Sequence, residues 1–234
     1  MAAYSSEHPF VYLTADVVAF SMHPESGLSV LMVRRGGTPY KGRWAFPGGF
    51  VDDREDVERA ARRELREETG IRSRSLVLHQ LGAYTSPRRD PRHRVVSVPF
   101  LALLPEAVAP VAGDDADGAR WLTVQELLGA KLAFDHAQIL QDALAWLQRA
   151  LEHTTMATGL LPEEFTISEL REVYEAVWGR PLDPGNFQRK VTGTPGFVED
   201  TGSRRVGGRG RPATLFTAGD ATEVWPPMSR ERDR

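Results

Sequence analysis

The first seventy residues change from a strand-like to a helical pattern of hydrophobic positions. Between Phe10 and about Val51, the segments "FVYLTADVVAF" and "LSVLMVRR" are rich in β-branched residues and are separated by the turn-like "HPESG". Such runs around a proline and glycine turn predict a β-hairpin. The stretch "EDVERAARRELREETG" then adopts helical spacing, and Gly70 is placed as its stop, so one helix is predicted after the strands.

Further strands and a long helix are predicted up to His153. "SLVLHQLGAYTS" and "HRVVSVPFLALL" indicate strands on either side of the loop "PRRDPRHR", and "ARWLTVQELL" indicates a short strand and a helical turn. Asp135 is placed to cap the next helix. The apolar residues of that helix recur at three- and four-residue steps: Ile139, Leu140, Ala143, Leu144, Leu147 and Leu151. The prediction is an α/β domain over residues 1–153, with a mixed β-sheet and flanking helices.

A second, smaller domain is predicted after the first. "TTMATGLLPEEF" has few features that specify order, and we place a linker there at residues 154–162. The following domain is assigned to residues 163–225. The last residues, 226–234, read "PPMSRERDR" and are predicted to be disordered.

Local signals predict two helices and a hairpin in the second domain. Thr166 and Glu169 form a capping box at the start of an amphipathic helix that ends at Gly179. Asp183 followed by Pro184 is typical of a helix start, so a second helix is predicted only a few residues later. "GFVEDTGSRRVGGRGRPATLFTA" then predicts a β-hairpin with a glycine-rich tip. Together these elements predict a small winged helix-turn-helix.

Composition excludes several classes of site. The 234 residues carry a net charge of -3, so contact with nucleic acid requires local segregation of basic residues. The absence of cysteine excludes disulfides, a thiolate nucleophile and a zinc–thiolate site, and six scattered histidines show no ligand spacing. No run approaches the roughly 18 apolar residues of a membrane span, and the start "MAAYSSEHPF" does not resemble a signal peptide. We therefore expect a cytoplasmic protein with no membrane partner.

Carboxylates are concentrated on one side of the first predicted helix. At about 100° per residue, Glu64, Glu67 and Glu68 lie on the same side as the apolar residues Ala60 and Ala61. Inward-facing carboxylates repel one another unless a divalent cation neutralises them, and Mg²⁺ or Mn²⁺ is the cation that suits oxygen ligands. The alternative is a solvated helix with ion pairs between arginine and glutamate. The spacing of the whole segment favours the metal site, because a pattern G-x5-E-x7-R-E-U-x-E-E-x-G-U, with U aliphatic, is matched by Gly49, Glu55, Arg63, Glu64, Leu65, Glu67, Glu68, Gly70 and Ile71.

This segment, together with the preceding "WAFPGGFV", resembles the Nudix box. The resemblance implies the Nudix fold and a ligand in which a nucleoside diphosphate is linked to another group. It implies that Glu64, Glu67 and Glu68 hold Mg²⁺ or Mn²⁺ against a pyrophosphate, that Glu55 assists and that Arg63 orients the glutamates. These five residues are the candidate catalytic residues.

Six residues are candidates for binding the ligand itself. Gly48 and Gly49 belong to the turn before the helix, and Arg89 and Arg92 lie in the loop "PRRDPRHR", where guanidinium groups can bind a phosphate or a ribose. Solvated charge at the tip of a hairpin is an equally good interpretation of the loop. Trp44 and Phe46 are candidates for stacking on a base, although aromatic residues beside a strand more often belong to the core.

Basic residues are segregated in the second domain. Between Thr201 and Gly219 there are four arginines and no acidic residue, whereas the acids gather around the first helix. The second helix carries Asn, Gln and Arg, whose side chains form paired hydrogen bonds with adenine and guanine edges. A mobile basic loop and a protein-docking module are the alternatives. The predicted contacts with double-stranded DNA are Asn186, Gln188, Arg189, Lys190, Arg204, Arg205, Arg209 and Arg211.

The segments "FTISELREVYEAVWGRPLDPGNFQRKV" and "GRGRPATLF" resemble the C-terminal domain of the Nudix-related transcriptional regulators of NAD metabolism, the NrtR family. The resemblance covers nearly the whole chain. It implies a homodimer that represses genes of NAD biosynthesis or salvage from a palindromic operator and is released by ADP-ribose or a related nucleotide. Family members often have an eroded box, whereas this one is whole. A magnesium-dependent ADP-ribose pyrophosphatase, or a protein with both functions, therefore stays open.

Overall fold

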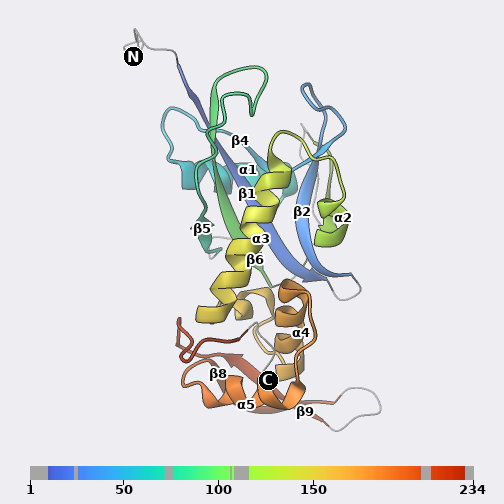
Figure 1. Cartoon of the computed structure of the whole chain (residues 1–234), viewed down its shortest axis with the longest axis vertical. Coiled ribbons are helices and arrows are strands. Elements are labelled where there is room, and N and C mark those ends of the chain that lie inside the picture. The colour runs from blue at the N-terminus through green and yellow to red at the C-terminus, as the bar shows by residue number, and fades with distance from the viewer. Residues whose placement is uncertain are drawn as a thin grey trace. The chain divides into compact units, whose positions relative to one another are not determined.

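The computed structural model describes residues 10–23, 26–71, 76–105, 107, 116–206 and 212–229 (Figure 1). The chain divides into two compact units. The first comprises Met1–Ala19, Val30–Ala102 and Val108–Leu140. The second comprises Phe20–Ser29, Leu103–Ala107 and Gln141–Arg234. Among the residues so described, no helix is long and apolar enough to cross a membrane.

A seven-stranded sheet forms the framework of the first unit. Five strands follow the order β3-β2-β1-β6-β5, while β4 pairs with β1 and β7 pairs with β2. Strand β1 is central, and its residues from Ala15 to Phe20 are almost completely buried, including the one acid in this apolar run, Asp16. The antiparallel pairing of β4 with β1 places Gly48 opposite Asp16. The strands are β1 (Tyr12–His23), β2 (Gly27–Arg35), β3 (Trp44–Ala45), β4 (Gly48–Phe50), β5 (Leu78–Gln80), β6 (Val95–Leu104) and β7 (Ala116–Thr123).

Helix α1 (Val57–Thr69) lies within the predicted helical stretch and ends at the predicted stop, Gly70 (Figure 1). The Asp56 side chain accepts a hydrogen bond from the Arg59 N–H at 2.8 Å, which caps the first turn. Gly70 has a φ of 71°, a left-handed conformation that glycine adopts without strain, and this residue ends the helix. The buried face consists of Ala60, Ala61, Leu65 and Thr69.

Two further helices follow the sheet. Helix α2 (Val124–Leu128) begins at a capping box made by Thr123 and Glu126, and α3 spans His136–His153. Asp135 precedes α3 as predicted, but Arg89 binds its carboxylate, and the carbonyl of Asp135 accepts the N–H groups at the start of the helix. Of the predicted apolar stripe of α3, Leu144 is half-buried and the other five residues are fully buried.

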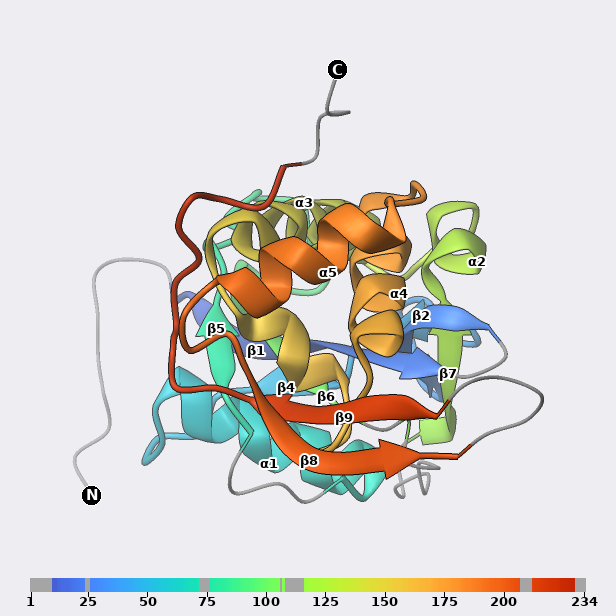
Figure 2. The same cartoon turned by 90° about the horizontal axis from the view of Figure 1, so that it is seen from below.

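The second unit contains the predicted winged helix-turn-helix. The capping box of Thr166 and Glu169 starts α4 (Ile167–Trp178), and Asp183 caps α5 (Pro184–Gly193) through the N–H of Asn186 at 2.7 Å. Strands β8 (Val198–Arg205) and β9 (Ala213–Ala218) pair antiparallel and form the wing; Figure 2 shows them side by side.

Two segments differ from their prediction. Within the predicted linker 154–162, a 3-10 helix, η1 (Met156–Leu160), buries Ala157 and Leu160 in the second unit. Part of the predicted disordered tail is also packed, because Met228 is 5% exposed and its N–H donates to the carbonyl of Glu152 at 2.8 Å. Apolar burial explains both differences. Residues 230–234 lie outside the described part of the chain.

Candidate functional site

The turn formed by Gly48 and Gly49 packs against two carboxylates of α1. The Gly48 N–H donates to Glu68 Oε2 at 2.9 Å. A Cβ atom at Gly49 would lie too close to the carboxylate of Glu64 as it is placed here, so a larger residue would displace that side chain. The predicted Nudix turn therefore brings Glu64 and Glu68 against the backbone of β4.

Negative charge is unfavourable at this point of the molecule. Burial raises the pKa of Glu68 to about 7, and repulsion from Glu64 and Asp16 adds to the effect. Burial also raises the pKa of Glu64, although the Arg63 guanidinium opposes that rise. Two half-buried carboxylates that repel each other fit a divalent cation with oxygen ligands.

Arg63 connects three of the predicted catalytic residues. Its Nη2 lies 2.5 Å from Glu55 Oε1, and its Nη1 lies 2.7 Å from Glu64 Oε1. The Arg63 guanidinium holds the pKa of Glu55 below its ordinary value. Arg63 Nη2 also donates to the carbonyl of Phe50 at 3.0 Å, which ties this network to β4. These contacts fit the orienting role that the resemblance implies for Arg63.

Glu67 does not join the other two predicted metal ligands in this geometry. Its side chain is 48% exposed and lies 2.9 Å from Arg66 Nη2 and 3.3 Å from Arg63 Nη1. Across the described ranges, no three His, Cys, Asp or Glu side chains are grouped so that they could hold a metal ion. The helical angle explains the difference, because Glu68 is displaced from Glu64 by about 40° in one direction and Glu67 by about 60° in the other. The assembled carboxylate pair is Glu64 and Glu68.

A cavity of about 150 Å³ opens beside the glycine turn. Five of the six predicted ligand-binding residues line it: Phe46, Gly48, Gly49, Arg89 and Arg92. Trp44 is half-buried on β3 and is not among the lining residues. The cavity also contains residues that the sequence did not single out: Thr14, Asp16, Arg35, Ala45, Phe50, Asp90, Phe134 and His136.

Phe46 belongs to the core and not to a base-stacking surface. Its side chain is 1% exposed and stacks on His136 with 4.8 Å between ring centroids. The Phe46 N–H donates to His136 Nδ1 at 3.0 Å, and burial lowers the pKa of His136 to about 3. The imidazole is therefore neutral and carries its proton on Nε2, which lies 3.7 Å from Asp16 Oδ1. Asp16 is itself buried and accepts a hydrogen bond from Ser97 Oγ.

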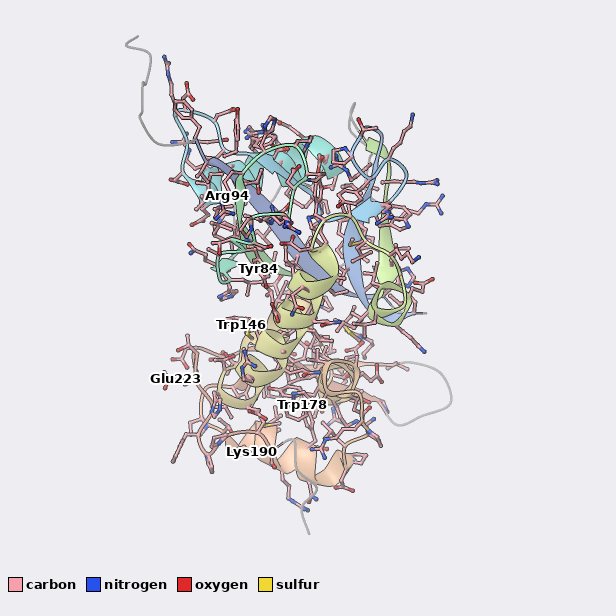
Figure 3. All side chains as sticks on the ribbon, turned by 45° about the horizontal axis from the view of Figure 1, so that its top comes forward. Tyr84, Arg94, Trp146, Trp178, Lys190 and Glu223 are labelled. Atoms are coloured by element: carbon pink, nitrogen blue, oxygen red, sulfur yellow. The ribbon has the colours of Figure 1, made fainter. Side chains whose placement is uncertain are left out.

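The two predicted loop arginines reach the cavity but already have carboxylate partners. Arg89 donates to both carboxylate oxygens of Asp135, at 2.9 and 2.7 Å. Arg92 donates to both oxygens of Asp90, at 3.1 and 2.7 Å. Arg94, labelled in Figure 3, instead donates to the carbonyl of Thr85 at 2.7 Å. The loop is thus an ion-paired wall of the cavity and not merely solvated charge.

The exposed face of α5 carries three of the predicted DNA contacts. Phe187 and Val191 are buried, whereas Asn186, Gln188 and Arg189 are exposed. At 100° per residue Arg189 lies opposite the buried side, where a helix meets a groove of DNA. Arg189 Nη2 donates to Asn186 Oδ1, so both side chains lie on the same surface.

Lys190 and Arg205 already have partners within the chain. Lys190, labelled in Figure 3, is half-buried, and its Nζ donates to the carbonyl of Pro226 in the C-terminal segment. Arg205 lies 2.6 Å from Glu169 Oε1 and donates to the carbonyl of Glu164 at 3.1 Å. Arg205 therefore holds the wing against the start of α4.

The adjacent Arg204 is exposed on β8. The predicted wing contacts Arg209 and Arg211 lie outside the described residues.

Comparison with known proteins identifies both domains. The NUDIX domain model matches residues 13–146, and the NrtR DNA-binding winged helix domain model matches residues 157–218. The chain is 34% identical over 213 residues to the ADPR responsive transcriptional repressor NtrR of Acinetobacter baylyi. The matched region covers 90% of this chain and 83% of that protein. It is also 42% identical over 122 residues to the ADP-ribose pyrophosphatase of Methanocaldococcus jannaschii. That matched region covers 52% of this chain and 69% of that protein.

Solved structures agree with this identification. Shewanella oneidensis NrtR complexed with a 27mer DNA is similar with a TM-score of 0.81 and 30% identity, over 93% of this chain and 99% of that chain. The NUDIX domain of the same protein complexed with ADP ribose is similar with a TM-score of 0.56 and 31% identity, over 62% of this chain and 94% of that chain. With a NUDIX domain followed by an NrtR winged helix domain, the chain therefore belongs to the NrtR family of Nudix-related transcriptional regulators, as its sequence predicted.

Proposed function

We propose that this protein is a transcriptional repressor that leaves its operator when the Nudix domain binds ADP-ribose or a related nucleotide. One observation carries the proposal: a single chain holds both a cavity beside a carboxylate pair and an exposed recognition helix. The similarity over 90% of the chain to an ADPR responsive repressor supports the same function. The genes controlled are those of NAD biosynthesis or salvage.

DNA is bound through α5 and the wing. Asn186, Gln188 and Arg189 read base edges in the major groove, because their side chains are exposed and can form paired hydrogen bonds. Arg204 binds phosphate, together with Arg209 and Arg211 of the hairpin tip. A homodimer places two such helices on the half-sites of a palindromic operator.

The effector is bound in the cavity beside α1. Glu64 and Glu68 would hold Mg²⁺ or Mn²⁺, which would neutralise the two carboxylates and attract the pyrophosphate oxygens. Arg63 fixes the orientation of Glu64, and the glycine turn lets the backbone approach the ligand closely. Glu67 joins the ion only if its side chain turns away from Arg66.

Release from DNA requires that the effector bind the two states of the protein with different affinities. Linkage then requires operator DNA to weaken ADP-ribose binding by the same factor by which ADP-ribose weakens operator binding. Both affinities are measured on the full chain, by fluorescence anisotropy for operator DNA and by calorimetry for ADP-ribose, with chromatography to verify that the nucleotide stays intact. Equal ADP-ribose affinity with and without saturating operator would rule out the coupling.

A second function, hydrolysis of ADP-ribose, is supported by the complete Nudix box and by the 42% identity to an ADP-ribose pyrophosphatase. In this case Glu55, which is ionised beside Arg63, assists at the carboxylate pair. Incubation with Mg²⁺ and ADP-ribose, followed by chromatography for AMP and ribose 5-phosphate, tests it. Release of DNA without product formation supports a pure sensor, whereas product formation in the wild type but not in Glu64→Gln supports both functions in one protein.

A further inference from the structure

The cavity beside the glycine turn contains three arginines whose electrostatic situations differ. Arg89 and Arg92 each bind one carboxylate with two hydrogen bonds, so their charges are already compensated within the protein. Such planar, paired contacts are the strongest that a guanidinium makes. Neither group can bind a ligand anion with the same geometry unless it first leaves its partner.

Arg35, at the end of β2, is the third arginine. Its Nε donates to the carbonyl of Pro39 at 2.9 Å, and its guanidinium lies 4.7 Å from the ring centroid of Phe134. Within the described part of the chain, no carboxylate lies within 4.0 Å of this guanidinium, and its two terminal nitrogens donate no hydrogen bond. The Pro39 and Phe134 contacts fix the orientation of the group and leave its terminal nitrogens unpaired at the cavity.

The environment of Arg35 favours an added anion. Burial and repulsion from Arg92 both lower the pKa of Arg35, which means that its positive charge is incompletely compensated. The adjacent wall carries uncompensated negative charge. Gly48 lines the cavity there and donates its N–H to Glu68, whose ionised form is disfavoured by burial and by like charges. A pyrophosphate accompanied by a divalent cation would compensate both walls, because Arg35 would bind the anion and the carboxylates of Glu64 and Glu68 would hold the cation.

We propose that Arg35 is the residue that binds the anionic pyrophosphate of the effector, while Arg89 and Arg92 position the walls of the cavity. This inference rests on the proposed function, because it assigns the residue that contacts the pyrophosphate of the proposed effector. Arg89 fixes the Phe134–His136 segment through Asp135, and Arg92 fixes its own loop through Asp90. The terminal nitrogens of Arg35 can then donate two hydrogen bonds to phosphate oxygens.

The chain offers a matched control one residue away. Arg34 precedes Arg35 on the same strand, is exposed, and donates through Nε to the carbonyl of Gly42 at 3.2 Å. Consecutive residues of a strand point to opposite faces, and Arg34 does not line the cavity. Arg34→Gln thus removes the same charge without changing the cavity.

The test is calorimetric titration of the full chain with ADP-ribose, with the nucleotide verified as intact afterwards. Loss of two charge-assisted hydrogen bonds predicts a dissociation constant about 10- to 100-fold higher for Arg35→Gln. Arg34→Gln should stay within about twofold of the wild type. Arg35→Lys should recover part of the loss, because it keeps the charge but not the paired donors. Salt should weaken binding less in Arg35→Gln than in the wild type, whereas a merely structural defect would leave that dependence unchanged.

The outcomes separate the two levels of the proposal. If the wild type does not bind ADP-ribose, the proposed effector is wrong. If the wild type binds and Arg35→Gln binds equally well, the assignment of Arg35 is overturned while the proposed function stands. Should Arg35→Gln fail to fold, the comparison passes to Arg35→Lys, for which affinity equal to that of the wild type would overturn the assignment. Unchanged operator affinity of each variant without nucleotide verifies that the DNA-binding domain is intact.

Discussion

Neutralising Glu68 should change stability and metal affinity in opposite directions. In the metal-free protein the Glu68 carboxylate is half-buried, accepts one hydrogen bond from the Gly48 N–H and faces the like charges of Glu64 and Asp16. Glu68→Gln keeps an oxygen that can accept the same hydrogen bond and removes the charge. We therefore expect the variant to be more stable than the wild type without metal, and to bind Mn²⁺ more weakly.

The magnitude follows from the pKa of Glu68. It is raised to about 7, against an ordinary value of 4.5. At about 1.4 kcal/mol per pKa unit, the ionised carboxylate destabilises the metal-free fold by roughly 3 kcal/mol. This value is an upper bound, because the glutamine amide must also be accommodated beside the backbone of β4.

Because the pKa of Glu68 is raised in the folded protein, the stability of the metal-free fold depends on pH. A carboxyl group whose pKa is higher in the folded protein binds its proton more tightly there than in the unfolded chain. Relative to high pH, proton binding by Glu68 therefore stabilises the fold. This stabilisation is fully present below about pH 4.5 and is lost as the pH rises through 7. The difference between Glu68→Gln and the wild type should grow between pH 5 and pH 8 and then level off.

The assay is urea unfolding in EDTA across this pH range, together with Mn²⁺ calorimetry at pH 8. Glu67→Gln is the matched control, because Glu67 is on the same helix but its side chain is 48% exposed and paired with Arg63 and Arg66. That substitution should change the free energy of unfolding by less than about 1 kcal/mol. Mn²⁺ at 100 times its dissociation constant should stabilise the wild type by about 2.7 kcal/mol. A Glu68→Gln variant that is no more stable than the wild type at pH 8 in EDTA would show that the ionised Glu68 carboxylate does not destabilise the metal-free fold.

Three further predictions concern DNA. Arg189→Ala should cost about 1 to 3 kcal/mol on the operator and much less on random DNA, measured by anisotropy, because lost base contacts affect only the sequence that is read; equal losses on both would contradict this role. Arg204→Gln should flatten the slope of log K for DNA binding against log salt by about 1. Arg205→Gln should leave that slope unchanged, because Glu169 already neutralises Arg205, and equal slopes for the two variants would contradict this difference. Neutralising Arg209 and Arg211 together should flatten the slope by roughly 1 to 2 on operator and unrelated DNA alike, and an unchanged slope would remove the hairpin tip from the interface.

Signals within a few residues predicted the helices well. The capping box of Thr166 and Glu169, the pair Asp183–Pro184 and the stop at Gly179 each act through hydrogen bonds or backbone angles inside one helical turn. Such features depend little on the rest of the chain. Burial of η1 was not predicted, because it depends on apolar neighbours that the sequence does not place in space.

Contacts between distant residues account for most of what the sequence did not reveal in the cavity. Arg89 and Asp135 are 46 residues apart, and Phe46 and His136 are 90 residues apart. The sequence around Arg89, a predicted phosphate-binding residue, does not indicate that its guanidinium is paired with Asp135. In the same way, the sequence around Phe46, a predicted base-stacking residue, does not indicate that its ring lies against the imidazole of His136. One signal was available for Asp16, a lone acid inside the apolar run "LTADVVAF", since a buried charge in a central strand requires partners or a function.

The complete Nudix box supports ligand binding more directly than turnover. Hydrolysis needs a base near its working pH, whereas the Arg63 guanidinium lowers the pKa of Glu55 and so makes that carboxylate a weaker base. Glu68, with a pKa near 7, is the better base without metal, but the same carboxylate is half of the pair that would hold the cation. A metal ligand cannot take up a proton in the same step. Repression needs only a ligand that distinguishes two states of the protein, and for that task the ion pairs of Arg63 help to keep the glutamates in place.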